Sequence, residues 1–274
     1  MTISANDFQY ISKMVQDLSA IVLETGKEYL VESRILPLAK KEGYESIEEL
    51  VKNLRNGPKN GLSTKVVDAM TTNETSFFRD IHPFETLKNH IIPDLIKKMG
   101  ATKQLNIWSG ASSSGQEPYT FAMILRENFP ELRTWKVNYM SSDISNEMLD
   151  RCRKGVYSQL EINRGLPATL MVKYFERHGT EWQAKEELRN MIEFHYLNLC
   201  EKWPLLPKMD LVLLRNVLIY FDVDMKKKIL KQIQDLLQPD GYLFLGAAET
   251  TMSLNDSFER MDYKQSGCYR IREG

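Results

Sequence analysis

The hydrophobic and polar positions of the 274-residue chain follow two different patterns. Up to about residue 70, apolar residues recur at intervals of three and four, as Phe8, Ile11, Val15 and Leu18 do, which is typical of amphipathic helices. Beyond about residue 100, short apolar runs alternate with helical stretches. This alternation is typical of βαβ units and of a largely parallel, doubly wound sheet. The pattern therefore predicts an all-helical N-terminal domain followed by an α/β domain.

Local signals place the helices of the N-terminal domain. Asn6 or Asp7 is expected to cap the first helix, and Ser46 with Glu49 forms a capping-box pattern before the third. Pro37 inside the second helix predicts a kink or a restart. The first helix is expected to end at Thr25-Gly26, and the others to span residues 27–42, 47–54 and 62–70, with a loop over 56–61.

The rest of the chain predicts the α/β domain and its interruptions. Strands are expected over residues 104–108, 136–142, 192–197, 211–214, 242–246, 258–263 and 268–271, and helices over 83–99, 146–153 and 225–237, with a turn at Pro239-Asp240-Gly241. Residues 155–190 break this rhythm, which indicates an inserted small subdomain of a helix and a β-hairpin.

These elements divide the chain into an N-terminal helical domain over residues 1–70, a linker over 71–82 and an α/β domain over 83–274. The linker is polar, then doubly aromatic at Phe77-Phe78, then charged at Arg79-Asp80, with no helical period. We expect it to contribute donors and acceptors to the active site, although it could equally be a connector that its phenylalanines anchor to the core.

The stretch from Gln104 to Leu125 predicts a buried strand, a tight loop and a helix. Gly110 and Gly115 bracket four small residues, and Glu117-Pro118 then opens the helix. A loop of small residues before a helix N-terminus lets a ligand approach the backbone closely. An ordinary strand–turn–helix without a ligand is the alternative.

The residues that follow this loop restrict the ligand. A phosphate-binding loop needs Lys and Ser or Thr where this chain has Gln116 and Glu117, and the dinucleotide pattern of three glycines is absent. A carboxylate at that place would repel phosphates, but it suits a ligand with a cationic end. S-adenosylmethionine (SAM), which carries an ammonium and a sulfonium, is such a ligand.

Several polar side chains follow the predicted parallel strands, whose carboxyl ends usually form the ligand site. Asp143 could accept hydrogen bonds from ribose hydroxyls or cap the next helix, and the two roles are compatible. Asn198 and Asn216 could pair with an adenine edge.

Composition and charge exclude several classes of protein. The chain has 36 basic and 37 acidic residues, so no broad nucleic-acid-binding surface is expected. Cys152, Cys200 and Cys268 form no paired motif, which fits a reducing cytoplasm. The longest apolar run is interrupted by Arg215-Asn216, and the first residues do not resemble a signal peptide, so no membrane insertion is expected. The four histidines show no metal-ligand spacing.

One basic cluster stands out in the N-terminal domain. Arg34, Lys40 and Lys41 recur along the second predicted helix. They could form a docking face for an acidic protein or an ordinary solvated helix face.

Six stretches together resemble chemotaxis receptor methyltransferases of the CheR type, which are SAM-dependent protein-glutamate O-methyltransferases. They are TTNETSFFRD, IWSGASSSGQEPYTFAMIL, SSDIS, LNL, LLRNVLIYFD and LLQPDGYLFLGAAE. They occur in the family's order and cover nearly the whole chain, and their combination is far more specific than any one of them.

The resemblance implies a cytoplasmic enzyme that transfers a methyl group from SAM to glutamate side chains of chemoreceptors, with S-adenosylhomocysteine (SAH) as product and no metal. Its receptor would dock through Arg34, Lys40 and Lys41. By motif, catalysis falls to Arg79 and Tyr220. The residues that the resemblance places against SAM are Asn73, Thr75, Arg79, Glu117, Asp143, Asn198, Leu199, Arg215 and Asn216.

Two features depart from the family pattern. The family often has paired acids at the loop-to-helix junction, whereas here Gln116 leaves Glu117 as the one carboxylate. The segment from Arg177 to Trp182 is also shorter than in members that grip a receptor's C-terminal peptide. Two other functions stay open: SAM-dependent methylation of another acceptor, and a non-catalytic SAM-binding module that interacts with receptors.

Overall fold

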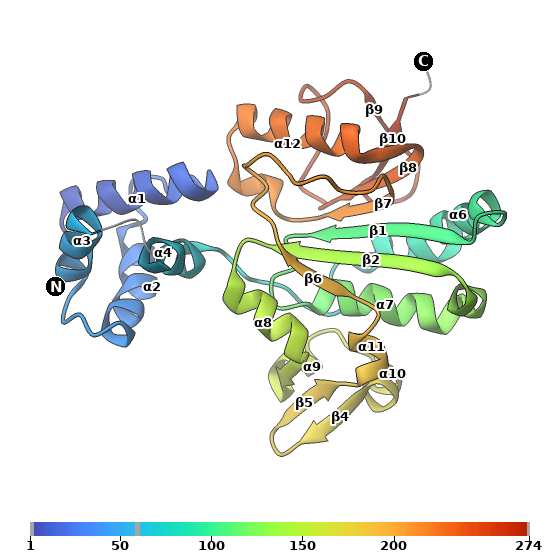
Figure 1. Ribbon diagram of the computed structural model, residues 1–274, viewed down its shortest axis with the longest axis horizontal. Coiled ribbons are helices and arrows are strands. Elements are labelled where there is room, and N and C mark those ends of the chain that lie inside the picture. Colours follow the sequence, from blue (N-terminus) through green and yellow to red (C-terminus); the bar gives the residue numbers. More distant parts are fainter. Residues whose placement is uncertain (1–2, 58–60, 273–274) are drawn as a thin grey trace. The chain divides into compact units, whose positions relative to one another are not determined.

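The computed structural model describes residues 3–57 and 61–272, and these form two compact units (Figure 1). The smaller unit holds the chain up to Thr72 together with Tyr220–Met225. The larger unit holds Asn73–Ile219 and the chain from Lys226 onward. The predicted linker over residues 71–82 is therefore divided after Thr72, and most of it belongs to the larger unit.

The smaller unit is built from helices, as predicted. Each helix contributes fully buried apolar side chains to one cluster, among them Ile11, Val31, Leu50 and Val66. The four helices are α1 (Ala5–Ser19), α2 (Glu28–Lys41), α3 (Ile47–Asn56) and α4 (Gly61–Met70).

Helix α1 corrects two details of the sequence interpretation. Its N-cap is Ser4, whose hydroxyl accepts a hydrogen bond from Asp7 N, so neither Asn6 nor Asp7 is the cap. The helix ends at Ser19, well before Thr25-Gly26. Ser19 is buried and donates to a carbonyl one turn earlier, whereas Leu18, predicted on the buried face, is 37% exposed.

The predicted signals of α2 and α3 are confirmed in part. Helix α2 continues through Pro37 without a restart. Ser46 caps α3 by accepting from Glu49 N, but the Glu49 carboxylate accepts from Glu45 N, so the capping box is not closed. Residues 58–60 of the predicted loop lie outside the described part of the chain.

The Arg34 side chain binds the C-terminal end of α4 within the smaller unit. Its Nη1 donates to the backbone oxygens of Met70 and Thr71, both at 2.8 Å, and Nη2 lies 3.4 Å from Thr72 Oγ1. The guanidinium thereby satisfies carbonyls at the C-terminus of α4, which have no partner within the helix.

The larger unit contains a seven-stranded sheet with the order β6-β2-β1-β7-β8-β10-β9. Neighbouring strands from β6 to β8 run parallel, and β10 runs antiparallel to both of its neighbours. The mostly parallel, doubly wound sheet that was predicted is confirmed. Its strands are β1 (Gln104–Gly110), β2 (Lys136–Asp143), β6 (Glu193–Tyr196), β7 (Met209–Leu214), β8 (Leu237–Leu245), β9 (Phe258–Arg260) and β10 (Cys268–Ile271).

Helices cover both faces of this sheet. In Figure 1, α12 (Val223–Leu236) lies on the face toward the viewer and α6 (Ile92–Met99) on the far face. Leu105 and Ile107 of β1 share a buried cluster with Leu95 of α6 and with α7 (Gln116–Asn128). Helix α8 (Asn146–Lys154) follows β2.

The helix predicted over residues 83–99 is longer and less regular than expected. It begins with α5 (Ile81–Thr86), passes through a π-helical turn (Leu87–Ile91) and ends with α6. Pro93 lies in the first turn of α6, where it has no N–H and would clash with a carbonyl one turn earlier in a regular helix. We attribute the wider π-helical turn to this constraint.

Residues 155–190 form a small subdomain, as predicted. Its three-stranded antiparallel sheet has the order β3-β5-β4, so the expected hairpin is extended by one further strand. The elements are β3 (Val156–Ser158), α9 (Gln159–Asn163), α10 (Ala168–Tyr174), β4 (Phe175–His178), β5 (Glu181–Ala184) and α11 (Glu186–Arg189).

The predicted turn at Pro239-Asp240-Gly241 is wrong. Strand β8 runs through these residues, and its pairing with β7 shifts register between Met209 and Leu211. The irregular pairing accommodates the proline, which cannot donate to the ladder.

We expect Arg34→Lys to lower the stability of the smaller unit by about 1–2 kcal/mol, because an ammonium keeps the charge but loses the forked contact with the end of α4. Urea unfolding, followed by hydrogen exchange of the α4 amides, measures this. The exposed Lys40→Ala change is the control and should leave both unchanged. An Arg34→Lys protein as stable as the control would contradict the capping role.

Candidate functional site

The candidate site lies where the parallel strands end. Strand β1 runs parallel to β2 and β7, and β2 runs parallel to β6, so their carboxyl ends share one edge of the sheet. Gly110, Asp143, Asn198 and Arg215-Asn216 stand at or just beyond these ends. The structure thus places the predicted strand-end residues along one edge, as the sequence indicated.

The loop after β1 has an unusual backbone. Ala111, Ser113 and Gly115 all have positive φ, at 56°, 49° and 96°. Alternating left-handed residues turn successive N–H groups toward one side. Gly115 is required there, because a Cβ would lie 2.9 Å from the Tyr157 hydroxyl and 3.1 Å from Cys152 Sγ.

Asp143 binds this loop. Its Oδ2 accepts a hydrogen bond of 2.8 Å from Ser113 N, and its Oδ1 accepts one of 2.9 Å from Ser145 N. Burial raises the pKa of the Asp143 carboxyl to about 6, although the backbone N–H groups oppose this shift. Helix α8 is capped by Ser145, whose hydroxyl accepts from Met148 N, so Asp143 itself is not the cap.

The segment that follows Thr72 lies against the same loop. Ser113 Oγ donates to Asn73 O at 2.8 Å, and Phe78 N donates to Thr120 Oγ1 at 3.1 Å. Arg79 Nη1 donates to Glu74 O at 2.9 Å, which closes a short turn that contains Thr75. Asn73, Thr75 and Arg79 are therefore carried by one segment, fixed beside the loop after β1.

A buried guanidinium joins that segment to α7 and β7. The Arg215 side chain is 1% exposed; its Nη1 lies 2.6 Å from Glu117 Oε2, and its Nη2 lies 3.1 Å from both Arg79 O and Asp80 Oδ2. The ring of Phe84 lies beneath it. Within the described part of the chain, Arg215 Nε has no hydrogen-bond partner.

This arrangement fits the amino-acid end of SAM, which is a zwitterion. Glu117 offers a carboxylate for an ammonium, and its Oε1 has only a long contact of 3.4 Å with Ser109 Oγ. The Arg215 guanidinium supplies the positive charge that a ligand carboxylate requires nearby.

Asn198 and Leu199 form the turn after β6. Asn198 Oδ1 accepts from Cys200 N, and its Nδ2 donates to Glu201 Oε1, both at 3.1 Å. The Asn198 side chain therefore shapes its own turn, and Leu199 is buried beside it. This pair and the Arg215 cluster stand at different strand ends along the same edge of the sheet.

Asn216 is held by a residue that the sequence reasoning missed. Glu249 is 8% exposed, and its carboxylate accepts from three backbone N–H groups, those of Asn216 (2.8 Å), Ile219 (3.3 Å) and Gly246 (2.6 Å). Asn216 has a φ of 59°. Glu249 lies in the stretch GAAE that carried the resemblance, but nothing in its spacing indicated this contact.

Tyr220 ends a short 3-10 helix (Leu218–Tyr220) and belongs to the smaller unit. Its catalytic role stays a prediction.

The small subdomain also supports the loop after β1. The Tyr157 hydroxyl donates to Ser114 O at 2.9 Å, and the rings of Phe77, Tyr157 and Phe175 pack edge to face. Gly165 has a φ of 93°, and a Cβ there would lie 2.1 Å from Phe77 O. The sequence did not reveal this contact, because Phe77 and Gly165 are distant in the chain.

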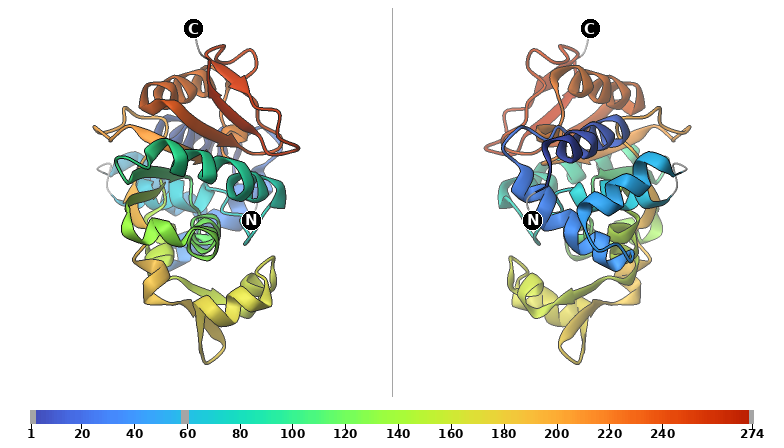
Figure 2. Two further views of the ribbon diagram at one scale, coloured as in Figure 1. Left: turned by 90° about the vertical axis from the view of Figure 1, so that its right-hand side faces the viewer. Right: turned by 90° about the vertical axis from the view of Figure 1, so that its left-hand side faces the viewer.

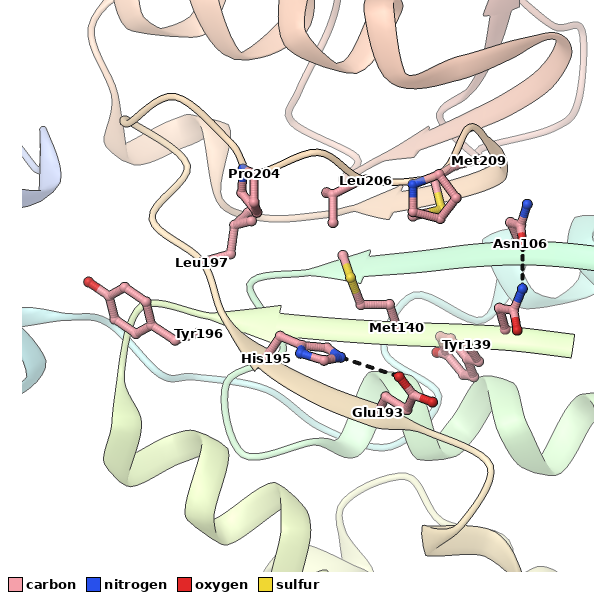
Figure 3. Close-up of a pocket in the computed structure, with 12 residues that line it drawn as sticks. Asn106, Tyr139, Met140, Glu193, His195, Tyr196, Leu197, Pro204, Leu206 and Met209 are labelled. Carbon is pink, nitrogen blue, oxygen red and sulfur yellow. Dashed lines mark hydrogen bonds and ion pairs between the residues drawn. The ribbon is translucent and has the colours of Figure 1, made fainter.

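A separate hollow of about 360 Å³ lies on the sheet face under the loop between Leu197 and Met209 (Figure 3). Met140 and Met209 line it, and Asn138 donates to Asn106 at one end. None of the predicted site residues lines this hollow.

In the described part of the chain, no three His, Cys, Asp or Glu side chains gather as metal ligands would. Among residues 3–57 and 61–272, no helix is both long and apolar enough to cross a membrane.

Comparison with known proteins identifies two matching family descriptions. "CheR methyltransferase, SAM binding domain" matches residues 73–266, and "CheR methyltransferase, all-alpha domain" matches residues 6–71. The chain is 40% identical to chemotaxis protein methyltransferase Cher2 of Pseudomonas putida, over 97% of this chain and 98% of that protein. It is 40% identical to chemotaxis protein methyltransferase 1 of Pseudomonas aeruginosa (99% and 100%) and 35% identical to the chemotaxis protein methyltransferase of Borreliella burgdorferi (91% and 90%).

Gly165→Ala should weaken SAH binding by about tenfold or more, because the new methyl group pushes Phe77 and with it the segment that carries Arg79. Gly179→Ala is the matched control, since Gly179 also has a positive φ but no atom lies within 4 Å of the added Cβ. Calorimetry with SAH, together with thermal unfolding of both variants, checks this. Equal affinity of the two variants would contradict the proposed contact.

The affinity for SAH should fall as the pH drops through about 6, because the ionised Asp143 carboxylate is the predicted acceptor for the ribose hydroxyls and protonation removes its charge. One unit below the pKa, the expected loss is about tenfold. Calorimetric titrations between pH 7.5 and 5 measure the profile. Asp143→Asn should bind weakly with a flat profile, and a flat wild-type profile would refute the assignment.

Proposed function

The chain belongs to the CheR methyltransferase family, and we propose that it transfers the methyl group of SAM to side-chain carboxylates of glutamates in the cytoplasmic domain of chemoreceptors. The products would be glutamate methyl esters and SAH. The observation that carries the proposal is the Arg215 guanidinium, which joins Glu117 to the backbone of Arg79. The predicted binding residue for the amino-acid end of SAM and the predicted catalytic arginine are thereby parts of one cluster.

The proposed roles of the cofactor residues combine the resemblance with the positions of these residues at the strand ends. Glu117 would bind the ammonium of SAM and Arg215 its carboxylate, while Asp143 would accept hydrogen bonds from the ribose. Asn198, Leu199 and Asn216, at the neighbouring strand ends, would border the adenine. Asn73 and Thr75 would close the site from the segment beside the small-residue loop. SAM, when bound, supplies a methyl group attached to a sulfonium.

Methyl transfer to a glutamate carboxylate does not require the protein to remove a proton. A glutamate side chain has an ordinary pKa of about 4.3, so it is ionised at neutral pH and needs no general base. An anion and a cation combine to give neutral products, so charge is lost on the way to the transition state. We infer that the site acts by orienting the two reactants and by excluding water, more than by adding fixed charges.

Arg79 is then a residue that positions the substrate carboxylate beside the methyl donor. Its guanidinium donates to Glu74 O through Nη1, which leaves its other N–H groups for a carboxylate. Tyr220 is the second proposed catalytic residue, and the resemblance alone supports this role.

The partner would be an acidic surface of a chemoreceptor in the cytoplasm. Lys40 and Lys41 are exposed on α2 and are suited to contact it. Arg34, the third residue predicted to dock the receptor, is engaged with the end of α4 by 2.8 Å hydrogen bonds.

Arg79→Ala should lower methyl transfer by about a hundredfold while changing the free energy of unfolding by less than about 1 kcal/mol, because the side chain orients reactants but lies near the surface. Tritiated SAM and membranes that contain the organism's chemoreceptors measure the transfer. Release of the label by mild base identifies a carboxyl methyl ester.

The exposed Arg133→Ala change in the same unit is the control for a lost positive charge. Base-stable label would indicate another acceptor, and SAM binding without any transfer would indicate the non-catalytic module. Wild-type turnover in Arg79→Ala would reject the role of Arg79.

A further inference from the structure

A second carboxylate contacts the guanidinium at the centre of the site. Asp80 Oδ2 lies 3.1 Å from Arg215 Nη2, whereas Glu117 Oε2 lies 2.6 Å from Nη1. Gln116 takes the place of one acid of the pair that the family often has, so the sequence indicated one carboxylate at this end of the site. The fold supplies the other from the residue next to Arg79.

The charge of the cluster depends on Asp80. Arg215 and Glu117 alone form a neutral pair, and a carboxylate already matched by a buried guanidinium attracts an incoming ammonium weakly. With Asp80, the three hydrogen-bonded side chains carry one net negative charge. Glu117 Oε1, whose contact with Ser109 Oγ is long at 3.4 Å, is then available to the ammonium.

We propose that Asp80 is a positioning residue for the amino-acid end of SAM. By sharing Arg215 it keeps the guanidinium in place when Glu117 turns to the ammonium of the ligand. This inference rests on the proposed function, because it presumes that SAM occupies the site.

Asp80 also has a backbone feature that suggests a simpler explanation. Its φ is 53°, a left-handed conformation in which Asp, Asn and Gly are favoured. An aspartate could stand there only to form this turn. The two explanations differ, because Gly and Asn preserve the turn but remove the charge.

The test measures binding of two ligands by calorimetry. SAH contains the amino-acid end, whereas 5′-methylthioadenosine has the same adenosine and sulfur but lacks that end. We expect Asp80→Gly and Asp80→Asn to bind SAH about tenfold more weakly than wild type and 5′-methylthioadenosine as well as wild type.

Two control variants show whether the loss is specific to the amino-acid end of the ligand. Asp143→Asn should weaken both ligands, because both contain the ribose. Asp256→Asn, an exposed aspartate in the same unit, should change neither.

Wild-type affinity for SAH in both Asp80 variants would overturn the inference, and so would equal losses for both ligands, which would indicate a structural role. If wild-type protein bound neither ligand, the proposed function itself would fail, and this outcome is distinct from the others.

Discussion

A guanidinium that is removed from water is stable only when oxygen atoms match its N–H groups and carboxylates match its charge. Arg215 meets this condition with Glu117 from α7, Asp80 and the backbone of Arg79. The requirement therefore fixes the relative positions of β7, the start of α7 and the segment before α5. The remaining donor, Nε, has no hydrogen-bond partner among the described residues.

The small-residue loop after β1 is supported from two directions. Asp143 accepts from Ser113 N on one side, and the Tyr157 hydroxyl of the small subdomain donates to Ser114 O on the other. Phe77 packs against the same tyrosine, so the subdomain contacts both the loop and the segment that precedes Arg79. The inserted residues thus help to hold the candidate cofactor site in place, whatever partner their outer face contacts.

Strands and one helix cap could be predicted from the sequence because residues close together in the chain determine them. Alternating apolar runs located every strand of the main sheet, and Ser46 was identified as a helix cap from its immediate neighbours. Where several nearby residues can cap a helix, the prediction failed: Asn6 or Asp7 was expected, and Ser4 is the cap. The contacts of Asp80 and Glu249 could not be predicted from the sequence. Asp80 contacts an arginine far away in the chain, and Glu249 accepts from backbone N–H groups, and neither kind of contact produces a periodic pattern. The resemblance predicted which residues contact SAM, but not which neighbours hold those residues in place.

The partners of Arg215 are far apart along the chain, at separations of 98 residues for Glu117 and 135 for Asp80. Contacts between residues so far apart in the chain form late in folding. The loop between them must close, at a cost in entropy, before the contact can stabilise the chain. A nascent chain that has not yet reached β7 carries the two acids without their shared counter-ion. SAM can therefore stabilise the folded protein but not the early intermediates of folding. Its affinity then reports whether the C-terminal half of the sheet has packed against the rest of the unit.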